Sequence, residues 1–227
     1  MTCITLTIAD LRMCNACDLD RLQSDSPLKI TRVADLTRHL GCAPDDDEPL
    51  PLRTWWDLPT TSVPNRWWSL RAAAPVKPIK LFAVRGACLA ARRVLPLTRE
   101  EDRVLCLTAI EAAEAWVANP CEETVAAARA AYSARAADAA SSPADPASIA
   151  ARDAVDYAMA AARATARAAA IDAVTYASAT TFYVDCAIVA HATANNADVD
   201  AACNAEHEAQ CADLDRLLAE LEGEGAP

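Results

Sequence analysis

The residues best suited to chemistry are three cysteines and one histidine near the N-terminus. Cys14 and Cys17 form a C-x2-C pair, and His39 with Cys42 forms an H-x2-C pair. Sulfur and imidazole nitrogen are the ligands that tetrahedral zinc prefers, so these four residues are a candidate structural zinc site. Both pairs fall within or at the end of expected helices, and ordinary buried thiols are the alternative interpretation. No other cofactor is expected.

Two further patterns match catalytic or metal sites less closely. Glu111 and Glu114 lie one helical turn apart, but a carboxylate di-metal site also needs Glu-x-x-His motifs, which the chain lacks. We expect these acids to be solvated or to pair with arginines such as Arg103. His191 lies among alanine and valine, where we expect it to pack in the core or a helix groove. No nucleophile–histidine pair and no Gly-rich loop can be named, so we expect no enzyme.

The elements that position these residues are predicted to be helices. From Cys121 to Cys211 the chain is rich in alanine, has two prolines and has no glycine. Alanine favours helices most strongly, whereas glycine and proline break them. We therefore predict an all-α fold built around an antiparallel alanine-rich bundle. Because 53% of the residues are hydrophobic but only 5% are aromatic, closely approaching backbones must hold it together, and self-association is a further expectation.

The chain is expected to comprise four segments. They are a small helical N-terminal region (1–42), a connector rich in Pro and Trp (43–75), the bundle with its acidic last helix (76–222) and a flexible tail (223–227). The stretch 42–64 is expected to be irregular. Helices are expected over 8–22, 31–40, 66–74, 78–94, 98–118, 119–140, from 145 onward with a bend or break within 175–184, and from 198 onward.

Local signals set these boundaries. Thr7 and Thr98 each open a pattern typical of a capping box, in which residues at both ends of the first turn bond to each other's backbone. Gly41 is expected to end the second helix. Asn119 and Asp198 are expected to cap the helices that follow them, because a short polar side chain there accepts an orphan backbone N–H.

Acidic residues are concentrated in two places. The net charge is −11, of which the run Asp45, Asp46, Asp47 and Glu48 supplies four negative charges. Residues 197–227 contain nine acids and one base. Such a balance disfavours nucleic acid as a ligand and favours a protein partner with a basic surface.

The last helix combines an apolar seam with two acidic stripes. The seam is expected to comprise Cys203, His207, Gln210, Leu214, Leu217 and Leu221, at alternating spacings of four and three. The stripes repeat every seven residues and comprise Glu206, Asp213 and Glu220, and then Glu208, Asp215 and Glu222. They serve either solubility or the docking of a basic partner.

Two tryptophan pairs are the most prominent aromatic feature. Trp55–Trp56 and Trp67–Trp68 lie in the connector, beside its acidic run. Tryptophan is enriched at interface hot spots, so all four residues are candidates for partner binding. The alternative is that they fill gaps beside helices that lack large side chains.

The ten cysteines are expected to be reduced. The segment Met1–Thr5 lacks the basic and apolar regions of a signal peptide, so we expect a cytoplasmic protein with thiols as small core residues. No stretch reaches the roughly 18 uncharged apolar residues that a membrane span needs, so no membrane association is expected.

Two segments carry a resemblance to a known family. Lys80–Leu97, KLFAVRGACLAARRVLPL, leads into Ala109–Trp116, AIEAAEAW, and alanine-rich helices follow. Together with Leu11-Arg12 and Ala16-Cys17 they resemble a family of alanine-rich helical proteins of bacteria and phages labelled immunity proteins. The resemblance covers about 66–194 and implies an all-helical protein that neutralises a toxin by binding it. It implies no catalytic residues.

The chain departs from that family in its Trp-containing connector and its acidic last helix, where we expect partner choice to lie. The leading hypothesis is a non-enzymatic inhibitor that covers a basic surface on a toxin or nuclease. One alternative is a phage anti-defence inhibitor, of anti-CRISPR type, that mimics nucleic-acid charge. Another is a self-associating helical scaffold. Both inhibitor hypotheses require a rigid acidic surface, so the sequence leaves them open.

Overall fold

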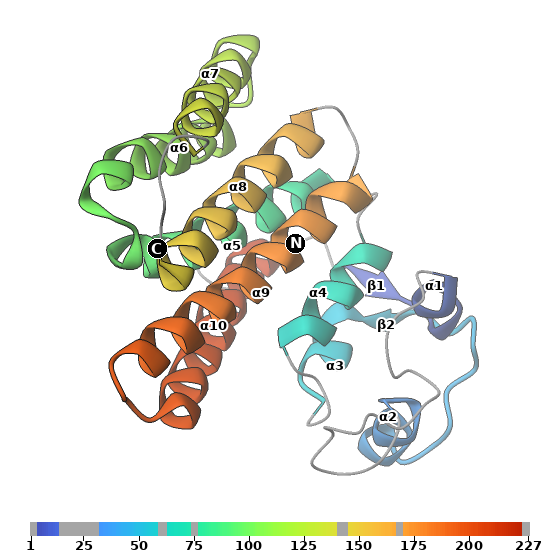
Figure 1. Cartoon of the computed structure of the whole chain (residues 1–227). Coiled ribbons are helices and arrows are strands. Elements are labelled where there is room, and N and C mark those ends of the chain that lie inside the picture. Colours follow the sequence, from blue (N-terminus) through green and yellow to red (C-terminus); the bar gives the residue numbers. More distant parts are fainter. Residues whose placement is uncertain are drawn as a thin grey trace. The chain divides into compact units, whose positions relative to one another are not determined.

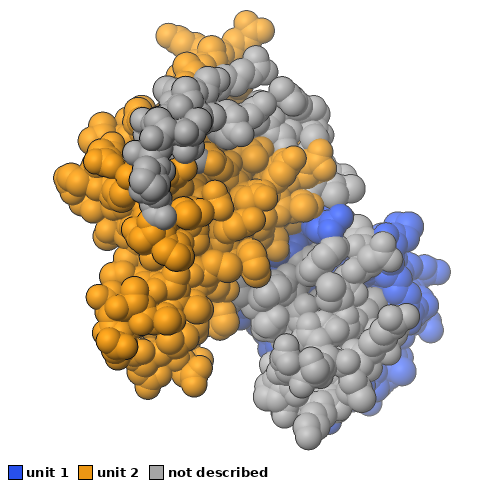
Figure 2. All heavy atoms as spheres, viewed as in Figure 1, with its two compact units in different colours: residues 1–79 blue, residues 80–227 orange. Residues whose placement is uncertain are grey.

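The computed structural model describes residues 4–13, 32–58, 63–73, 77–139, 145–166 and 170–223. In this part of the chain it contains ten α-helices and one two-stranded ribbon, which confirms the all-α fold (Figure 1). The chain separates into two compact units, residues 1–79 and residues 80–227 (Figure 2). Each unit is described by itself below.

The first unit joins the N-terminal region and the connector. Its elements are β1 (Thr5–Leu6), α1 (Ile8–Met13), α2 (Arg32–Leu40), β2 (Leu50–Pro51), α3 (Leu52–Trp56) and α4 (Val63–Ala72). The strands pair antiparallel, with Thr5 opposite Pro51 and Leu6 opposite Leu50. The expectation of an irregular stretch over 42–64 was therefore wrong in part, because residues 50–51 pair with β1, residues 52–56 form α3 and α4 begins at Val63.

Two predicted signals in this unit are confirmed. The N–H of Thr7 donates to Asp10 Oδ2 at 2.9 Å, and the N–H of Asp10 donates to Thr7 Oγ1 at 3.0 Å, which is a capping box at the start of α1. Gly41 follows α2 with φ of 75°, the left-handed conformation that ends a helix and that glycine adopts without strain. The predicted extension of the first helix to Leu22 lies outside the described residues.

The second unit is the alanine-rich bundle. Its elements are α5 (Lys77–Val94, from Lys80 onward), the 3-10 turn η1 (Leu95–Leu97), α6 (Glu100–Ala118), α7 (Glu122–Ala139), α8 (Pro146–Ala166), α9 (Ala170–Ala194) and α10 (Val199–Glu222). Asp198 accepts from the N–H of Ala201 at 3.0 Å, so its predicted capping role is confirmed.

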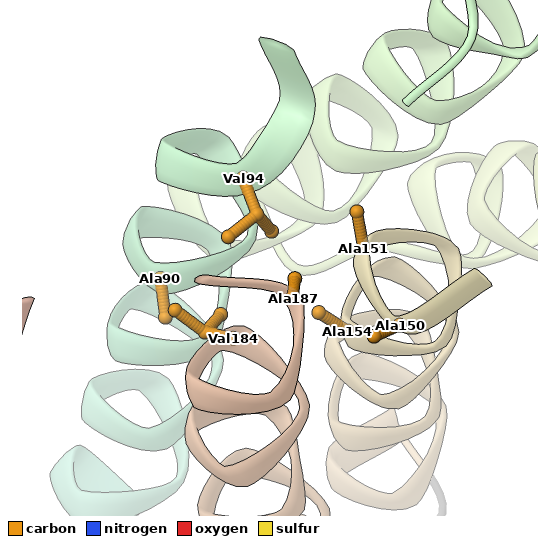
Figure 3. Packing of buried hydrophobic residues seen from close by; sticks show 7 residues of the cluster. All are labelled: Ala90, Val94, Ala150, Ala151, Ala154, Val184 and Ala187. Atoms are coloured by element: carbon orange, nitrogen blue, oxygen red, sulfur yellow. The ribbon is translucent and has the colours of Figure 1, made fainter. Parts of the chain in front are cut away.

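The core of the bundle is made of small side chains. The cluster where α5, α8 and α9 meet consists of Ala90, Val94, Ala150, Ala151, Ala154, Val184 and Ala187 (Figure 3). Five of these seven residues are alanines, so the helix backbones approach each other closely and leave no room for longer side chains. This packing agrees with the expectation drawn from the composition.

The predicted capping residues of two helices were wrong. Thr98 does not cap α6, because its hydroxyl donates to the carbonyl of Leu95 at 2.6 Å and closes η1 instead; Arg99 is the N-cap residue. Asn119 does not cap α7. There the N–H of Cys121 donates to Thr124 Oγ1 at 3.2 Å, and the helix begins at Glu122. In the first case the predicted cap bonds to another backbone group, and in the second a nearby threonine takes the place of the predicted cap.

The β-branched patch from Thr175 to Val184 does not bend or break a helix. It lies inside α9, and the preceding helix already ends at Ala166. The hydroxyls of Thr180 and Thr181 donate to the carbonyls of Tyr176 at 3.0 Å and Ser178 at 2.7 Å. Threonine is tolerated in a helix when its hydroxyl bonds to a carbonyl one turn earlier, so the prediction of a break failed.

Helix α9 is also long and apolar enough to cross a membrane, by length and composition, over Asp172–Ala194. In the structure it packs along α8 and α10, and its Asp185 is hydrogen-bonded to Gln210 of α10.

A larger side chain in the core is expected to destabilise the bundle. Ala154→Leu places three extra carbon atoms at a fully buried position, and we expect the free energy of unfolding to fall by about 1–3 kcal/mol. Ala115→Leu, at an exposed position of α6, is the matched control and is expected to change stability by less than about 0.5 kcal/mol. Urea unfolding followed by circular dichroism measures both, and equal losses would contradict the packing described here.

Candidate functional site

The first acidic stripe of α10 faces another helix of the same unit. Arg93 of α5 donates through Nε to Glu206 Oε1 at 2.8 Å and also pairs with Asp213. Eight residues earlier on α5, Arg85 lies 2.6 Å from Glu220 Oε2. Because the earlier arginine meets the later acid, α5 and α10 run antiparallel along this row of ion pairs.

The pair of Glu206 and Arg93 is the most buried part of this row. The side chain of Glu206 is 7% exposed and that of Arg93 is 22% exposed. Removing a carboxylate from water to this extent costs free energy, which its cation and its hydrogen-bond donors offset. The first stripe is therefore a structural contact that holds α10 against α5.

The row continues into a polar network on α9. Gln210 Nε2 donates to Glu206 Oε1 and to Asp185 Oδ1, both at 3.0 Å. His207 Nε2 lies 3.3 Å from the other oxygen of Asp185. Three helices are thus joined by side-chain contacts that begin at Arg93 and end at His207.

These contacts bear on two predictions about α10. Glu206, Asp213 and Glu220 were candidates for docking a partner, and in the structure they pair with the chain's own arginines. The predicted seam is right at Gln210, Leu214 and Leu217 and wrong at its other positions. The buried residues of α10 are Glu206, Gln210, Leu214, Leu217 and Leu218, while His207 is exposed and Cys203 and Leu221 are half-buried. Arg85 and Arg93 lie eight residues apart on α5, and this spacing alone does not show that α10 becomes their neighbour.

The second stripe of α10 lies closer to solvent. Glu208 is exposed, and Asp215 and Glu222 are half-buried. Arg216, the base of this segment, lies 3.0 Å from Asp213 and 3.8 Å from Glu220, so it belongs to the first stripe. Glu208 is thus the exposed carboxylate of the second stripe.

The acidic run of the first unit is an exposed turn with one anchored member. Asp46 pairs with Arg12 of α1, and its carbonyl accepts the N–H of Ala9 at 3.0 Å. The N–H of Glu48 donates to the carbonyl of Asp45 at 3.1 Å, which closes the turn. Asp45, Asp47 and Glu48 are exposed. The turn is thus fixed at its base and presents carboxylates to solvent.

The tryptophans do not form a surface patch. Trp55 and Trp56 are 0% exposed and Trp67 is 1% exposed, so they are not available to a partner, and the alternative of gap-filling describes them better. The indole N–H of Trp55 donates to the carbonyl of Leu6 at 3.4 Å, and the Arg66 guanidinium lies 5.1 Å from the Trp56 ring. The side chain of Trp68 lies outside the described residues.

The candidate zinc site is described only in part. Cys14 and Cys17 lie outside the described residues, while His39 and Cys42 are exposed. Among the residues that the structure describes, no group of three or more His, Cys, Asp and Glu side chains could hold a metal ion. The zinc hypothesis therefore remains a prediction that metal analysis of the purified protein can test.

Other candidate residues have structural partners. Glu114 forms a bidentate pair with Arg92 at 2.7 and 2.6 Å, and this hydrogen-bonded pair raises the pKa of Arg92. An arginine partner was predicted for Glu114, but Arg103 binds Glu100 instead. His191 is exposed on the last turn of α9, beside the side-chain amide of Asn195, so its predicted place in the core was wrong.

Two cysteines have strongly different environments. Cys88 is buried on α5, and burial, reinforced by the nearby Glu114 carboxylate, raises the pKa of its thiol to about 12. Cys121 lies at the start of α7, where hydrogen bonding to Thr124 holds the pKa of its thiol below the ordinary value. Only the thiolate is a strong nucleophile, so these two thiols should differ widely in reactivity.

Comparison with family models, with curated proteins and with solved structures found no match to this chain.

Removing the Arg93 cation is expected to destabilise the bundle. Arg93→Met leaves the buried Glu206 carboxylate without its principal cation, and we expect a loss of about 2 kcal/mol in the free energy of unfolding. The control Arg216→Met removes a cation whose side chain is 53% exposed, and should cost less than about 0.5 kcal/mol.

A double variant separates charge from packing. Arg93→Met with Glu206→Met removes both charges, so part of the loss should be recovered. Urea unfolding measures the series. Equal stability of Arg93→Met and Arg216→Met would contradict the role given to the α5–α10 row.

Thiol alkylation should distinguish Cys121 from Cys88. In iodoacetamide labelling followed by peptide mass spectrometry, Cys121 should react with a midpoint below the ordinary thiol pKa of about 8.5, and Cys88 should react only after unfolding. Thr124→Val removes the hydroxyl and should raise the midpoint of Cys121, whereas Thr124→Ser should keep it low. Equal labelling rates for the two cysteines in the folded protein would contradict these environments.

Proposed function

We propose that the chain is a non-enzymatic binding protein of the immunity type, which neutralises a toxin or nuclease by covering a basic surface. The observation that carries this proposal is the presence of exposed carboxylates in both units. They are Asp45, Asp47 and Glu48 in the turn of the first unit and Glu208 of α10 in the second unit.

The internal pairing sharpens the proposal. Arg85 and Arg93 neutralise the first stripe of α10, so part of the acidity of residues 197–227 serves the fold rather than a partner. The remaining acids are set on a helix fixed along its length and on a turn fixed at its base. Charges held in place can complement a partner without the entropic cost of ordering a flexible segment.

Binding would proceed by electrostatic attraction followed by steric blocking. A net charge of −11 attracts a basic partner over a distance comparable to the Debye length and raises the association rate. Once bound, the rigid helices would exclude the natural ligand of the basic surface. The protein would act in the cytoplasm without a cofactor, and this follows from the sequence-based expectations.

The first experiment is the capture of partners by the tagged full chain from its native host, at low and high salt. We expect one stoichiometric partner with a basic functional surface, retained at low salt and released at high salt because screening weakens exposed charges. Recovery of the chain alone, independent of salt, would contradict the inhibitor and favour a self-associating scaffold. The activity of the captured partner would distinguish toxin immunity from phage anti-defence.

Charge variants then locate the surface. The triple variants Asp45→Asn/Asp47→Asn/Glu48→Gln and Glu208→Gln/Asp215→Asn/Glu222→Gln each remove three carboxylates. At least one of them should weaken binding about tenfold. The control Glu111→Gln/Glu122→Gln/Glu123→Gln changes the net charge equally at exposed positions of α6 and α7 and should leave affinity within about twofold. Equal effects of all three would show that only net charge matters.

A further inference from the structure

An aromatic patch lies on α8 and α9 of the second unit. It comprises Tyr157 on α8 and Tyr176, Phe182 and Tyr183 on α9. The rings of Tyr157 and Tyr183 stack with centroids 4.9 Å apart, and those of Tyr157 and Tyr176 are 6.2 Å apart. Phe182 meets Tyr183 edge-on at 5.4 Å. The four rings therefore form one continuous group across two helices.

The patch is open to solvent. The side chain of Phe182 is 61% exposed, and the three tyrosines are half-buried. Aromatic residues make up only 5% of the chain, so four adjoining rings on one surface are a marked concentration. Exposed aromatic groups of this kind are typical of binding surfaces, where rigid rings contribute contact area at a low cost in conformational entropy.

Carboxylates border the same surface. Asp172 is exposed and lies one turn before Tyr176 on the same face of α9. Asp153 holds the equivalent position before Tyr157 on α8. A hydrogen bond with Tyr157 is the main reason that the pKa of Tyr183 is raised, and the negative charge of Asp153 adds to it. The patch therefore combines ring faces with acidic groups at its borders.

We propose that this aromatic patch binds an arginine-rich segment of a protein partner. A guanidinium group stacks on aromatic rings and pairs with carboxylates through its planar edge, so it uses both features together. A lysine ammonium is a more strongly hydrated point charge and gains less from the rings. Phosphates would be repelled by Asp153 and Asp172, which disfavours nucleic acid. The proposal rests on the proposed function, since it specifies where a basic partner docks.

The patch can be tested without the natural partner. Fluorescently labelled octa-arginine and octa-lysine carry the same charge, and their binding to the full chain can be followed by anisotropy. We expect tighter binding of octa-arginine. Phe182→Ala and Tyr176→Ala should each weaken octa-arginine binding about threefold and change octa-lysine binding much less. Tyr183 is left unchanged because it packs against the bundle core.

Matched variants separate ring contacts from charge. Val104→Ala removes an apolar side chain that is 69% exposed on α6, and should leave both affinities unchanged. Asp172→Asn should weaken both peptides, whereas Glu111→Gln on α6 should have a smaller effect. Circular dichroism verifies that each variant is folded. An unchanged octa-arginine affinity in the folded double variant Tyr176→Ala/Phe182→Ala would overturn the proposal.

Different experimental outcomes would contradict the aromatic patch as the docking site and the inhibitor function. If the double variant still captures the basic partner from the host with full affinity, the patch is not the docking site although the inhibitor function stands. If octa-arginine binds as expected but the host yields no partner, the patch is confirmed as a site for arginine and the inhibitor function is contradicted.

Discussion

An alanine side chain ends at its β-carbon, so a helix lined with alanines can bring its backbone close to a neighbour but buries little apolar area. The core where α5, α8 and α9 meet follows this rule, with alanine at five of its seven positions. Helix α10 is held differently. Its buried face includes Glu206 and Gln210, and its contacts with α5 and α9 include a row of charged and amide groups. Helix α10 also buries Leu214, Leu217 and Leu218, so apolar and charged contacts together hold it in the bundle.

The acids of α10 are divided between two faces of the helix. Glu206, Asp213 and Glu220 neutralise arginines of α5, while Glu208 lies on the solvent side of the same helix. One acidic helix therefore serves two purposes on two faces. The buried tryptophans of the first unit show the converse, because the residues that look most suited to binding fill its interior. The exposed rings belong to α8 and α9 instead.

Local signals in the sequence predicted much of the fold. Thr7, Gly41 and Asp198 act as expected because each needs only its own neighbours to end or begin a helix. Thr98 failed because its hydroxyl donates to the carbonyl of Leu95, and Asn119 failed because Thr124 accepts the backbone N–H of Cys121. The partners of Glu206 and the grouping of Tyr157 with Tyr183 depend on which helices become neighbours. Periodicity within one helix carries no information about that choice.

The row of ion pairs joins parts of the chain that are far apart in sequence. Arg93 is separated from Glu206 by 113 residues and from Asp213 by 120. At a synthesis rate of about 5–20 residues per second, α5 leaves the ribosome roughly ten seconds before its acidic partners exist. During that interval Arg85 and Arg93 are cations on a growing chain that does not yet contain α10. The ribosome therefore releases α10, the most acidic helix of the bundle, after the arginines of α5 that pair with it have been synthesised.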